Sequence, residues 1–256
     1  MIRYKSKNEI ERIRKSAQIV AKVFEEVKAV IRPGVSTWEI NRVADAVIRS
    51  NGAIPSFLHY GTPPFPGAIC ASINEEIVHG IPSKTRILRE GDIISIDVGA
   101  LLDGYHSDAA RTYPVGTISD EVRRLVVVTE ECFWKGFDQV KIGNRIGDIS
   151  HAIEEHATAS GFGIVRELTG HGIGENLHED PDVPNYGKER RGPRIEEGLV
   201  IAIEPMINMG TRNVRMLEDD WTIVTLDGKP SSHYENTVVA TSQGPLILTM
   251  LQTDGE

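Results

Sequence analysis

Residues of the same type recur through this chain at a fixed offset. Each of four residues is matched by an identical residue 109 positions later: Phe24, Gly34, Ile40 and Gly52. Around both sets, a helical pattern, a glycine turn, a second helical pattern and short β-like segments follow in the same order. Four matches can arise by chance. Taken as a repeat, they predict two similar α+β halves, roughly residues 1–115 and 116–256, that face each other.

Apolar periodicity and capping residues predict where the helices lie. Apolar side chains spaced three and four apart predict an amphipathic helix over 8–31. Ser36, with Glu39 three positions later, forms a capping box that begins a second helix, which stops near Asn51. Ser119 can cap a third helix, and a fourth is expected from about 147 to 161.

The composition is typical of a globular protein of the cytoplasm. The 256 residues can bury a core, and no linker-like stretch divides them, so a single domain over residues 1–256 is expected. The net charge of −9 without clustered Lys and Arg disfavours a nucleic-acid partner. No apolar stretch resembles a signal peptide or a membrane span, and two cysteines without a CxxC motif fit a reducing compartment. We expect a cytoplasmic monomer with no membrane partner.

Two apolar segments each contain a carboxylate. Glu90-Gly91 precedes the segment IISIDVG, which contains Asp97, and Glu197-Gly198 precedes LVIAIEP, which contains Glu204. Each acid is the sixth residue after its glycine. In the first segment, strand alternation puts Ile94, Ile96 and Val98 on one face and Asp97 on the other, which also begins apolar. Both acids are therefore expected to be buried, which is unfavourable without a positive group beside them. A salt bridge to arginine or a strand-end cap would also satisfy either acid taken alone.

A third acid favours a metal. Asp103-Gly104 is a type I′ hairpin signal, and this turn would pair Asp97 with Ala110 and Asp108 with Gly99. Asp97 and Asp108 then lie on one face as diagonal neighbours, about 7 Å apart. Two such carboxylates repel unless cations lie between them, and two metal ions about 3.5–4 Å apart would fit.

The histidines differ in what their positions imply. His151 and His156 are five residues apart, so a helix would not put both on one face, and we expect them at a helix surface. His171 lies between glycines, which indicates a constrained turn. His79 and His178 also lie beside turn residues, and local sequence leaves open whether they act or merely cap loops.

Several motifs together resemble the type I methionine aminopeptidases, metallopeptidases of the pita-bread fold. The resemblance runs from near residue 3 to near residue 250 and rests on NEEIVHGIP, IDVGALLDGYHSDAARTY, GHGIG followed by HED, IEPMI, and DDWTIVTLDGKPSSHYENT. It implies a pseudo-twofold α+β fold: a curved, largely antiparallel sheet with helices packed on its outer face. No zinc-finger extension or long insertion is evident, so the short bacterial form is expected.

The resemblance implies a ligand set and an activity. Two divalent ions (Co, Mn, Fe or Zn) would be held by Asp97, Asp108, His171, Glu204 and Glu235. Asp108 and Glu235 would bridge the ions, Asp97 would hold one, and His171 with Glu204 the other. The reaction would be removal of the initiator methionine from nascent proteins, near the ribosome, with small second residues favoured.

The resemblance also implies roles around the metals. A water held between the ions would attack the carbonyl of the first residue, and Glu204 would shuttle the proton. His178 would stabilise the oxyanion and His79 would contact the scissile amide. Besides these two histidines, the methionine pocket would be lined by Phe65, Cys70 and Trp221. The chain departs from familiar bacterial members at four positions, which puts the size of the pocket in question: His59, Thr62, Leu177 and Asn236.

Two alternatives remain. A proline-directed relative, an Xaa-Pro aminopeptidase or prolidase, would share the five ligands but carry a sizeable additional N-terminal domain. A non-catalytic pita-bread protein that binds ribosomes or RNA would be expected to have lost ligands and gained basic patches. Here all five ligands are present and the charge balance is acidic.

Overall fold

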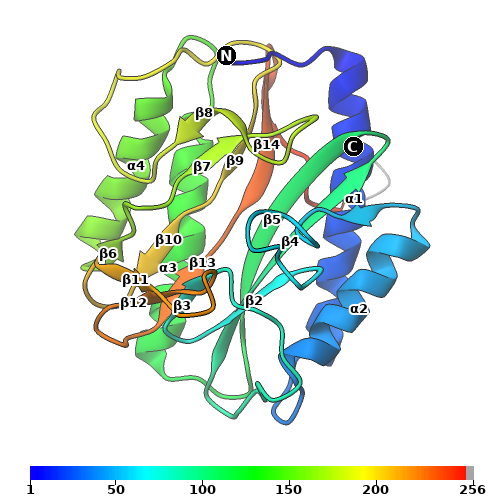
Figure 1. Ribbon diagram of the computed structural model, residues 1–256. Coiled ribbons are helices and arrows are strands. Elements are labelled where there is room, and N and C mark those ends of the chain that lie inside the picture. The colour runs from blue at the N-terminus through cyan, green and yellow to red at the C-terminus, as the bar shows by residue number, and fades with distance from the viewer. Residues whose placement is uncertain (252–256) are drawn as a thin grey trace.

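Two pairs of helices cover one side of the molecule. The computed structural model describes residues 1–251, and each half of the chain begins with two helices (Figure 1). The capping box at Ser36 and the N-cap at Ser119 are both present, as predicted. Among the described residues, no helix is long and apolar enough to cross a membrane. The helices are α1 (Lys7–Val30), α2 (Thr37–Ser50), α3 (Asp120–Phe137) and α4 (Ile146–Ala159).

A long antiparallel hairpin forms the centre of the first half. It consists of β4 (Ile93–Leu102) and β5 (Tyr105–Pro114). Its register confirms the prediction, since Asp97 lies opposite Ala110 and Gly99 opposite Asp108. Both turn residues have positive φ, 50° at Asp103 and 81° at Gly104, as a type I′ turn requires. The other edge of β4 pairs with β1 (Ile54–Pro55) and β2 (Cys70–Ile73).

The second half is built around an antiparallel sheet of its own, and two small sheets flank it. The larger sheet has the strand order β15-β14-β9-β7-β8. The small sheets have the orders β13-β10-β6 and β11-β12-β3, the latter including a strand from the first half. The strands are β3 (Glu76–Val78), β6 (Gly163–Ile164), β7 (Gly170–Gly172), β8 (Glu179–Val183), β9 (Val200–Ile203), β10 (Met206–Asn208), β11 (Val214–Met216), β12 (Ile223–Thr225), β13 (Ser231–His233), β14 (Asn236–Thr241) and β15 (Gly244–Ile247).

The sequence repeat is also a repeat of structure. Helices α2 and α4 begin and end 109 positions apart, and so do strands β1 and β6. Strands β4 and β9 begin 107 positions apart, the same offset that separates Asp97 from Glu204. Each half therefore places an acid four residues after the start of its strand, Asp97 within β4 and Glu204 directly after β9.

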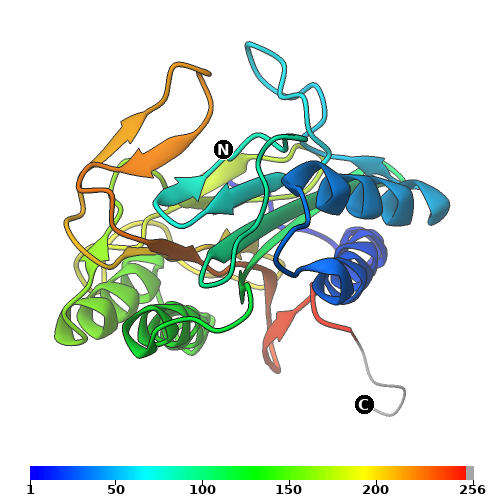
Figure 2. The same ribbon diagram turned by 90° about the horizontal axis from the view of Figure 1, so that it is seen from below.

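The halves meet where β5 runs beside β14. The Ala110 amide donates to the Glu235 carbonyl (3.3 Å), and the Glu235 amide donates to the Ala110 carbonyl (3.0 Å). The core of the first half packs α1 and α2 against Ile94, Ile96 and Val98, the face predicted from alternation. Figure 2 shows the helices on one side, with the β11–β12 hairpin and the loop before β2 projecting from the other. The helix-free face therefore presents the junction of the two halves.

Candidate metal centre

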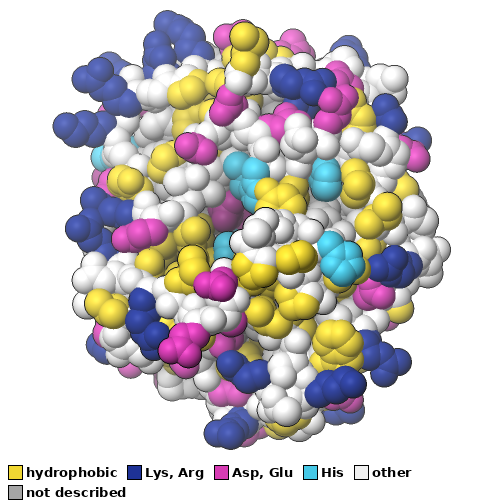
Figure 3. All heavy atoms as spheres, viewed as in Figure 1, with side chains coloured by type: hydrophobic (Ala, Val, Ile, Leu, Met, Phe, Trp, Pro, Cys, Tyr) yellow, Lys and Arg dark blue, Asp and Glu magenta, His cyan; other side chains and the backbone are white. Residues whose placement is uncertain are grey.

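A cavity of about 170 Å³ opens at this junction. Figure 3 shows the same face: histidines and hydrophobic side chains surround a hollow with acidic side chains within it. The structure brings together every residue that the sequence singled out for metal or substrate. The cavity is lined by Phe65, Cys70, His79, Asp97, Asp108, His171, His178, Glu204, Trp221 and Glu235, among others.

Strand register explains why the acids converge. Cys70 lies opposite Asp97, Asp97 opposite Ala110, and Ala110 exchanges backbone hydrogen bonds with Glu235. Residues directly opposite in antiparallel strands share a face, so Asp97 and Glu235 point to the same side. Across these paired strands, only the methyl group of Ala110 lies between Asp97 and Glu235. Asp108 is the diagonal neighbour of Asp97 on the same face. Because alanine is small, the three carboxylates surround a space that can hold a ligand.

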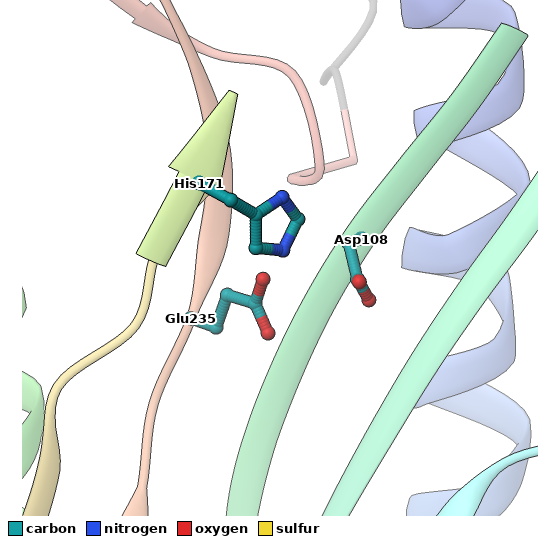
Figure 4. A group of neighbouring side chains, drawn as sticks. All are labelled: Asp108, His171 and Glu235. Atoms are coloured by element: carbon teal, nitrogen blue, oxygen red, sulfur yellow. The ribbon is translucent and has the colours of Figure 1, made fainter. Parts of the chain in front are cut away.

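Asp108, His171 and Glu235 form the tightest group. One candidate ligand atom from each lies within 4.8 Å of the other two. Figure 4 shows the three side chains pointing toward one another from β5, from β7 and from the residue before β14. The His171 Nε2 atom also lies 3.5 Å from Glu204 Oε1. His171 Nδ1 is 2.9 Å from the carbonyl of Gly172. Because Nδ1 donates there, Nε2 keeps a lone pair for a cation.

The electrostatics of the cluster demand positive charge. Burial raises the pKa of Asp97 to about 7. The pKa values of Asp108, Glu204 and Glu235 are raised well above their ordinary range, by burial first and by neighbouring carboxylates second. Burial also lowers the pKa of His171 to about 3, with the charge of His178 as a smaller cause, so its imidazole is neutral. The neutral imidazole does not offset the charge of the four carboxylates, so all four can be ionised together only if a cation is bound among them.

Unpartnered oxygen atoms show that the donor set fits divalent ions. Among residues 1–251, the buried atoms without a hydrogen-bond partner include Asp97 Oδ1, Asp108 Oδ1 and Glu235 Oε1. Buried polar atoms without partners are rare and costly unless a ligand satisfies them. Oxygen-rich ligation with one imidazole suits divalent transition metals such as Mn, Fe, Co or Zn.

Burial of two of the acids differs from the expectation. Asp97 and Glu204 are partly exposed, whereas Asp108 and Glu235 are fully buried. The prediction that both are buried rested on strand alternation, which cannot show that the face in question borders a cavity. The side chains of Asp97 and Glu204 form part of its wall.

Aromatic side chains enclose another part of the cavity. The rings of Phe65 and Trp221 meet edge to face with centroids 5.2 Å apart. The Trp221 indole donates to the Pro63 carbonyl (3.0 Å), which ties it to the loop before β2. His79 contacts Trp221 at 5.9 Å between centroids and has a φ of 59°, unusual for a residue other than glycine. A non-glycine residue in this strained region is often held there by function.

Among the cavity residues that the sequence did not single out, Tyr60 and His233 lie against proposed functional groups. The Tyr60 hydroxyl lies 2.6 Å from His178 Nδ1, and no sequence pattern identifies a loop residue of this kind. His233 is 1% exposed, and its Nε2 lies 3.8 Å from carboxylate oxygens of both Glu204 and Glu235. His233 could have been found, because it precedes Glu235 by two positions and alternation places both on one face.

The helix histidines lie elsewhere, as expected. His151 and His156 are on α4, where they face Glu189 at 3.7 Å and Glu131 at 2.8 Å. Neither lines the cavity. Of the four departures from familiar members, Leu177 is buried and lines the cavity. Asn236 is buried outside the lining and accepts a hydrogen bond from Arg111 (2.6 Å).

The comparisons with known proteins agree with this geometry. A family model described as metallopeptidase family M24 matches residues 11–242. The chain belongs to metallopeptidase family M24. Methionine aminopeptidase of Clostridium acetobutylicum is 50% identical to this M24 chain over 252 residues, 98% of this chain and 100% of the relative.

Solved structures separate the branches of the M24 family. Methionine aminopeptidase of Thermotoga maritima matches with a TM-score of 0.96 and 41% identity, over 98% of this chain and 100% of that one. Prolidase of Pyrococcus furiosus matches with a TM-score of 0.79 and 25% identity, over 98% of this chain but 66% of its own. The pita-bread fold is thus confirmed, and the likeness to methionine aminopeptidases exceeds that to proline-directed relatives. This chain is a hydrolase of the metallopeptidase class.

Proposed function

We propose that this M24 metallopeptidase removes the N-terminal methionine of nascent proteins and favours small second residues. The observation that carries the proposal is a small cavity with a carboxylate cluster and an apolar aromatic wall. Identity of 50% over nearly the whole chain to a methionine aminopeptidase supports it. We further infer a monomer that acts in the cytoplasm near the ribosome, with residues 1–256 as one catalytic domain.

The five residues predicted from sequence would hold two divalent ions. Asp97, Asp108 and Glu235 would hold the ions from the strands that meet at the junction of the two halves. His171 and Glu204 would complete the ligand set, and His171 Nε2 lies 3.5 Å from Glu204 Oε1. Bound ions of this kind supply Lewis acidity and activate water near neutral pH. The α-amine of the substrate would also approach the metal site, which would restrict cleavage to the first residue.

Three side chains of this protein would carry the remaining steps. Glu204 would accept the proton of the attacking water and pass it to the departing amine. The Tyr60 hydroxyl lies 2.6 Å from Nδ1 of His178. In the tautomer in which this hydroxyl donates, the imidazole proton is on Nε2, where it would stabilise the developing oxyanion. Burial lowers the pKa of His79 to about 4, so it is neutral and can hydrogen-bond to the scissile amide.

Peptide cleavage with matched substrates tests the function. The metal-loaded protein should cleave Met-Ala-Ser and leave Leu-Ala-Ser and an Xaa-Pro peptide nearly untouched, with products identified by mass spectrometry. Cleavage of the Xaa-Pro peptide without cleavage of Met-Ala-Ser would support the prolidase alternative. A protein that binds metal and cleaves none of the three would support a non-catalytic role.

Replacing the proposed oxyanion donor should slow the chemistry selectively. In His178→Ala all five ligands remain, so metal content should be unchanged, while kcat should fall about 10²–10³-fold. KM should rise much less, because the lost interaction forms mainly in the transition state. Steady-state kinetics and metal analysis on the same samples measure both quantities. Loss of a metal ion would instead identify His178 as a ligand.

Replacing the pocket aromatic should have the opposite signature. Trp221→Ala removes the ring that packs on Phe65 but touches none of the proposed ligands. Metal content should stay the same, KM for Met-Ala-Ser should rise, and discrimination against Leu-Ala-Ser should relax. One methylene in an apolar pocket typically changes discrimination by about 10–200-fold. Unchanged KM and unchanged discrimination would show that Trp221 does not form the methionine pocket.

A further inference from the structure

The segment before α1 is tied to the loop that carries His178. In Figure 1 it crosses the top of the molecule, from the N-terminal label to α1. Lys5 Nζ lies 2.5 Å from Glu179 Oε2, and Arg3 forms an ion pair with Glu175. The Lys5 amide also donates to the Gly198 carbonyl (2.7 Å), in the turn just before β9, the strand that leads to Glu204.

The two ion pairs differ sharply in burial. The side chains of Lys5 and Glu179 are 2% and 8% exposed, whereas those of Arg3 and Glu175 are 48% and 47% exposed. Exposed pairs contribute little, but removing one partner of a buried pair leaves an uncompensated charge. The Lys5–Glu179 pair is therefore expected to hold its surroundings, and the Arg3–Glu175 pair is not.

Glycines shape the space around Lys5. A Cβ atom at Gly174 would lie 2.7 Å from Lys5 Nζ, and one at Gly198 would lie 2.5 Å from the Lys5 carbonyl oxygen. Both distances are shorter than real Cβ contacts. The backbone on either side thus closes directly onto Lys5, so its ammonium group has little freedom to move.

Glu179 connects Lys5 to the β7–β8 segment, which carries both His171 and His178. Its Oε1 accepts from the Asn176 amide (3.1 Å) and its Oε2 pairs with Lys5, so the carboxylate spans the turn. Glu179 follows His178 directly and lies opposite Gly172, the neighbour of His171. A shift of this carboxylate would carry the His178 backbone with it.

We propose that Lys5 is a positioning residue for His178, acting through the buried Glu179 carboxylate. The inference rests on the proposed role of His178 as oxyanion donor. Without Lys5, the charge on Glu179 is left unpaired in a buried site, and the carboxylate must turn toward water. The turn from Gly174 to Glu179 then relaxes, and His178 leaves the place where its Nε2–H meets the developing charge. Displacement by about 1 Å can cost on the order of 10²-fold in rate.

The test is a double-mutant cycle on the metal-loaded enzyme. Lys5→Met should lower kcat for Met-Ala-Ser at least about tenfold, but less than His178→Ala does, with KM and metal content little changed. In the His178→Ala background, Lys5→Met should cost almost nothing further, since it acts through that histidine. Lys5→Arg keeps the charge but is bulkier than the space around Lys5 allows for, so it should recover only part of kcat. Arg3→Met, on the exposed pair of the same segment, is the matched control and should change kcat less than about twofold.

Different results overturn the inference in different ways. If Lys5→Met keeps the kcat of the wild type, or loses as much kcat in the His178→Ala background as alone, Lys5 does not act through His178. An equal loss in Arg3→Met would indicate a general effect of loosening the segment. If circular dichroism shows that Lys5→Met does not fold, the double-mutant cycle is repeated with Glu179→Gln in its place, and the same results are expected. Failure of the wild type to cleave Met-Ala-Ser would instead refute the proposed function itself.

Discussion

Removing the metal with a chelator should abolish cleavage of Met-Ala-Ser and lower the Tm. Ions that bind the folded state alone stabilise it by linkage, about 4 kcal/mol when free metal is a thousandfold above its Kd. For a chain of this length that corresponds to a rise in Tm on the order of 10 °C. Cleavage, differential scanning calorimetry and metal analysis on chelated and reloaded samples measure the effect. Full turnover in a sample shown to be metal-free would rule out metal-dependent catalysis.

The decrease in Tm on metal removal should become larger as pH rises. Without metal, burial raises the pKa of Asp97 from 3.8 to about 7, so the folded state binds more protons than the unfolded chain between these values. Stability of the metal-free protein therefore falls as pH rises through this window. The raised pKa values of Asp108, Glu204 and Glu235 act in the same direction. The Tm difference between loaded and metal-free protein should thus be larger at pH 8 than at pH 6.

Comparing loaded and metal-free samples at each pH provides the control. Groups distant from the cluster titrate alike in both samples, so their effects on Tm cancel in the difference. A Tm difference that shrinks as pH rises would contradict the assignment of the metal to this carboxylate cluster.

Asp108→Asn should cost more than about 10³-fold in kcat/KM while leaving the chain folded. Changing a group that merely orients a ligand already costs about 10–100-fold in metal affinity or activity, and Asp108 is itself a proposed ligand of the ions. The amide has the shape of the carboxylate but removes one negative charge from the cluster. In the metal-free state this relieves repulsion, so the metal-free variant should be at least as stable as the metal-free wild type.

The helix histidines are the controls for Asp108→Asn. His151→Ala and His156→Ala alter partly exposed residues that pair with acids outside the cavity, so kcat/KM should change less than about twofold. Metal analysis and kinetics should be run on all three variants. Full metal content and turnover in Asp108→Asn, or loss of both in a helix variant, would show that the ligand set is assigned wrongly.

Local signals were enough to predict the helices and the central hairpin. Ser36 and Ser119 cap helices wherever the chain later packs, because a cap involves only the first turn. Asp103-Gly104 favours one turn type, and the turn alone sets which residues of β4 and β5 are opposite. The diagonal placement of Asp97 and Asp108 was therefore determined by a few adjacent residues. Local patterns also singled out Glu204, at the end of an apolar segment, and His171, between two glycines. The resemblance to a known family supplied Glu235 and the grouping of all five residues as metal ligands.

Contacts between distant segments were decided only by the tertiary structure. The alignment of Ala110 with Glu235 depends on how the halves meet, and it leaves only the alanine methyl between two carboxylates. Tyr60 reaches His178, and Lys5 reaches Glu179, across more than a hundred residues of sequence. No local pattern encodes such pairs, because their energy arises when separate elements bury a shared surface. Sequence determined which chemical groups are present, and packing decided which of them touch.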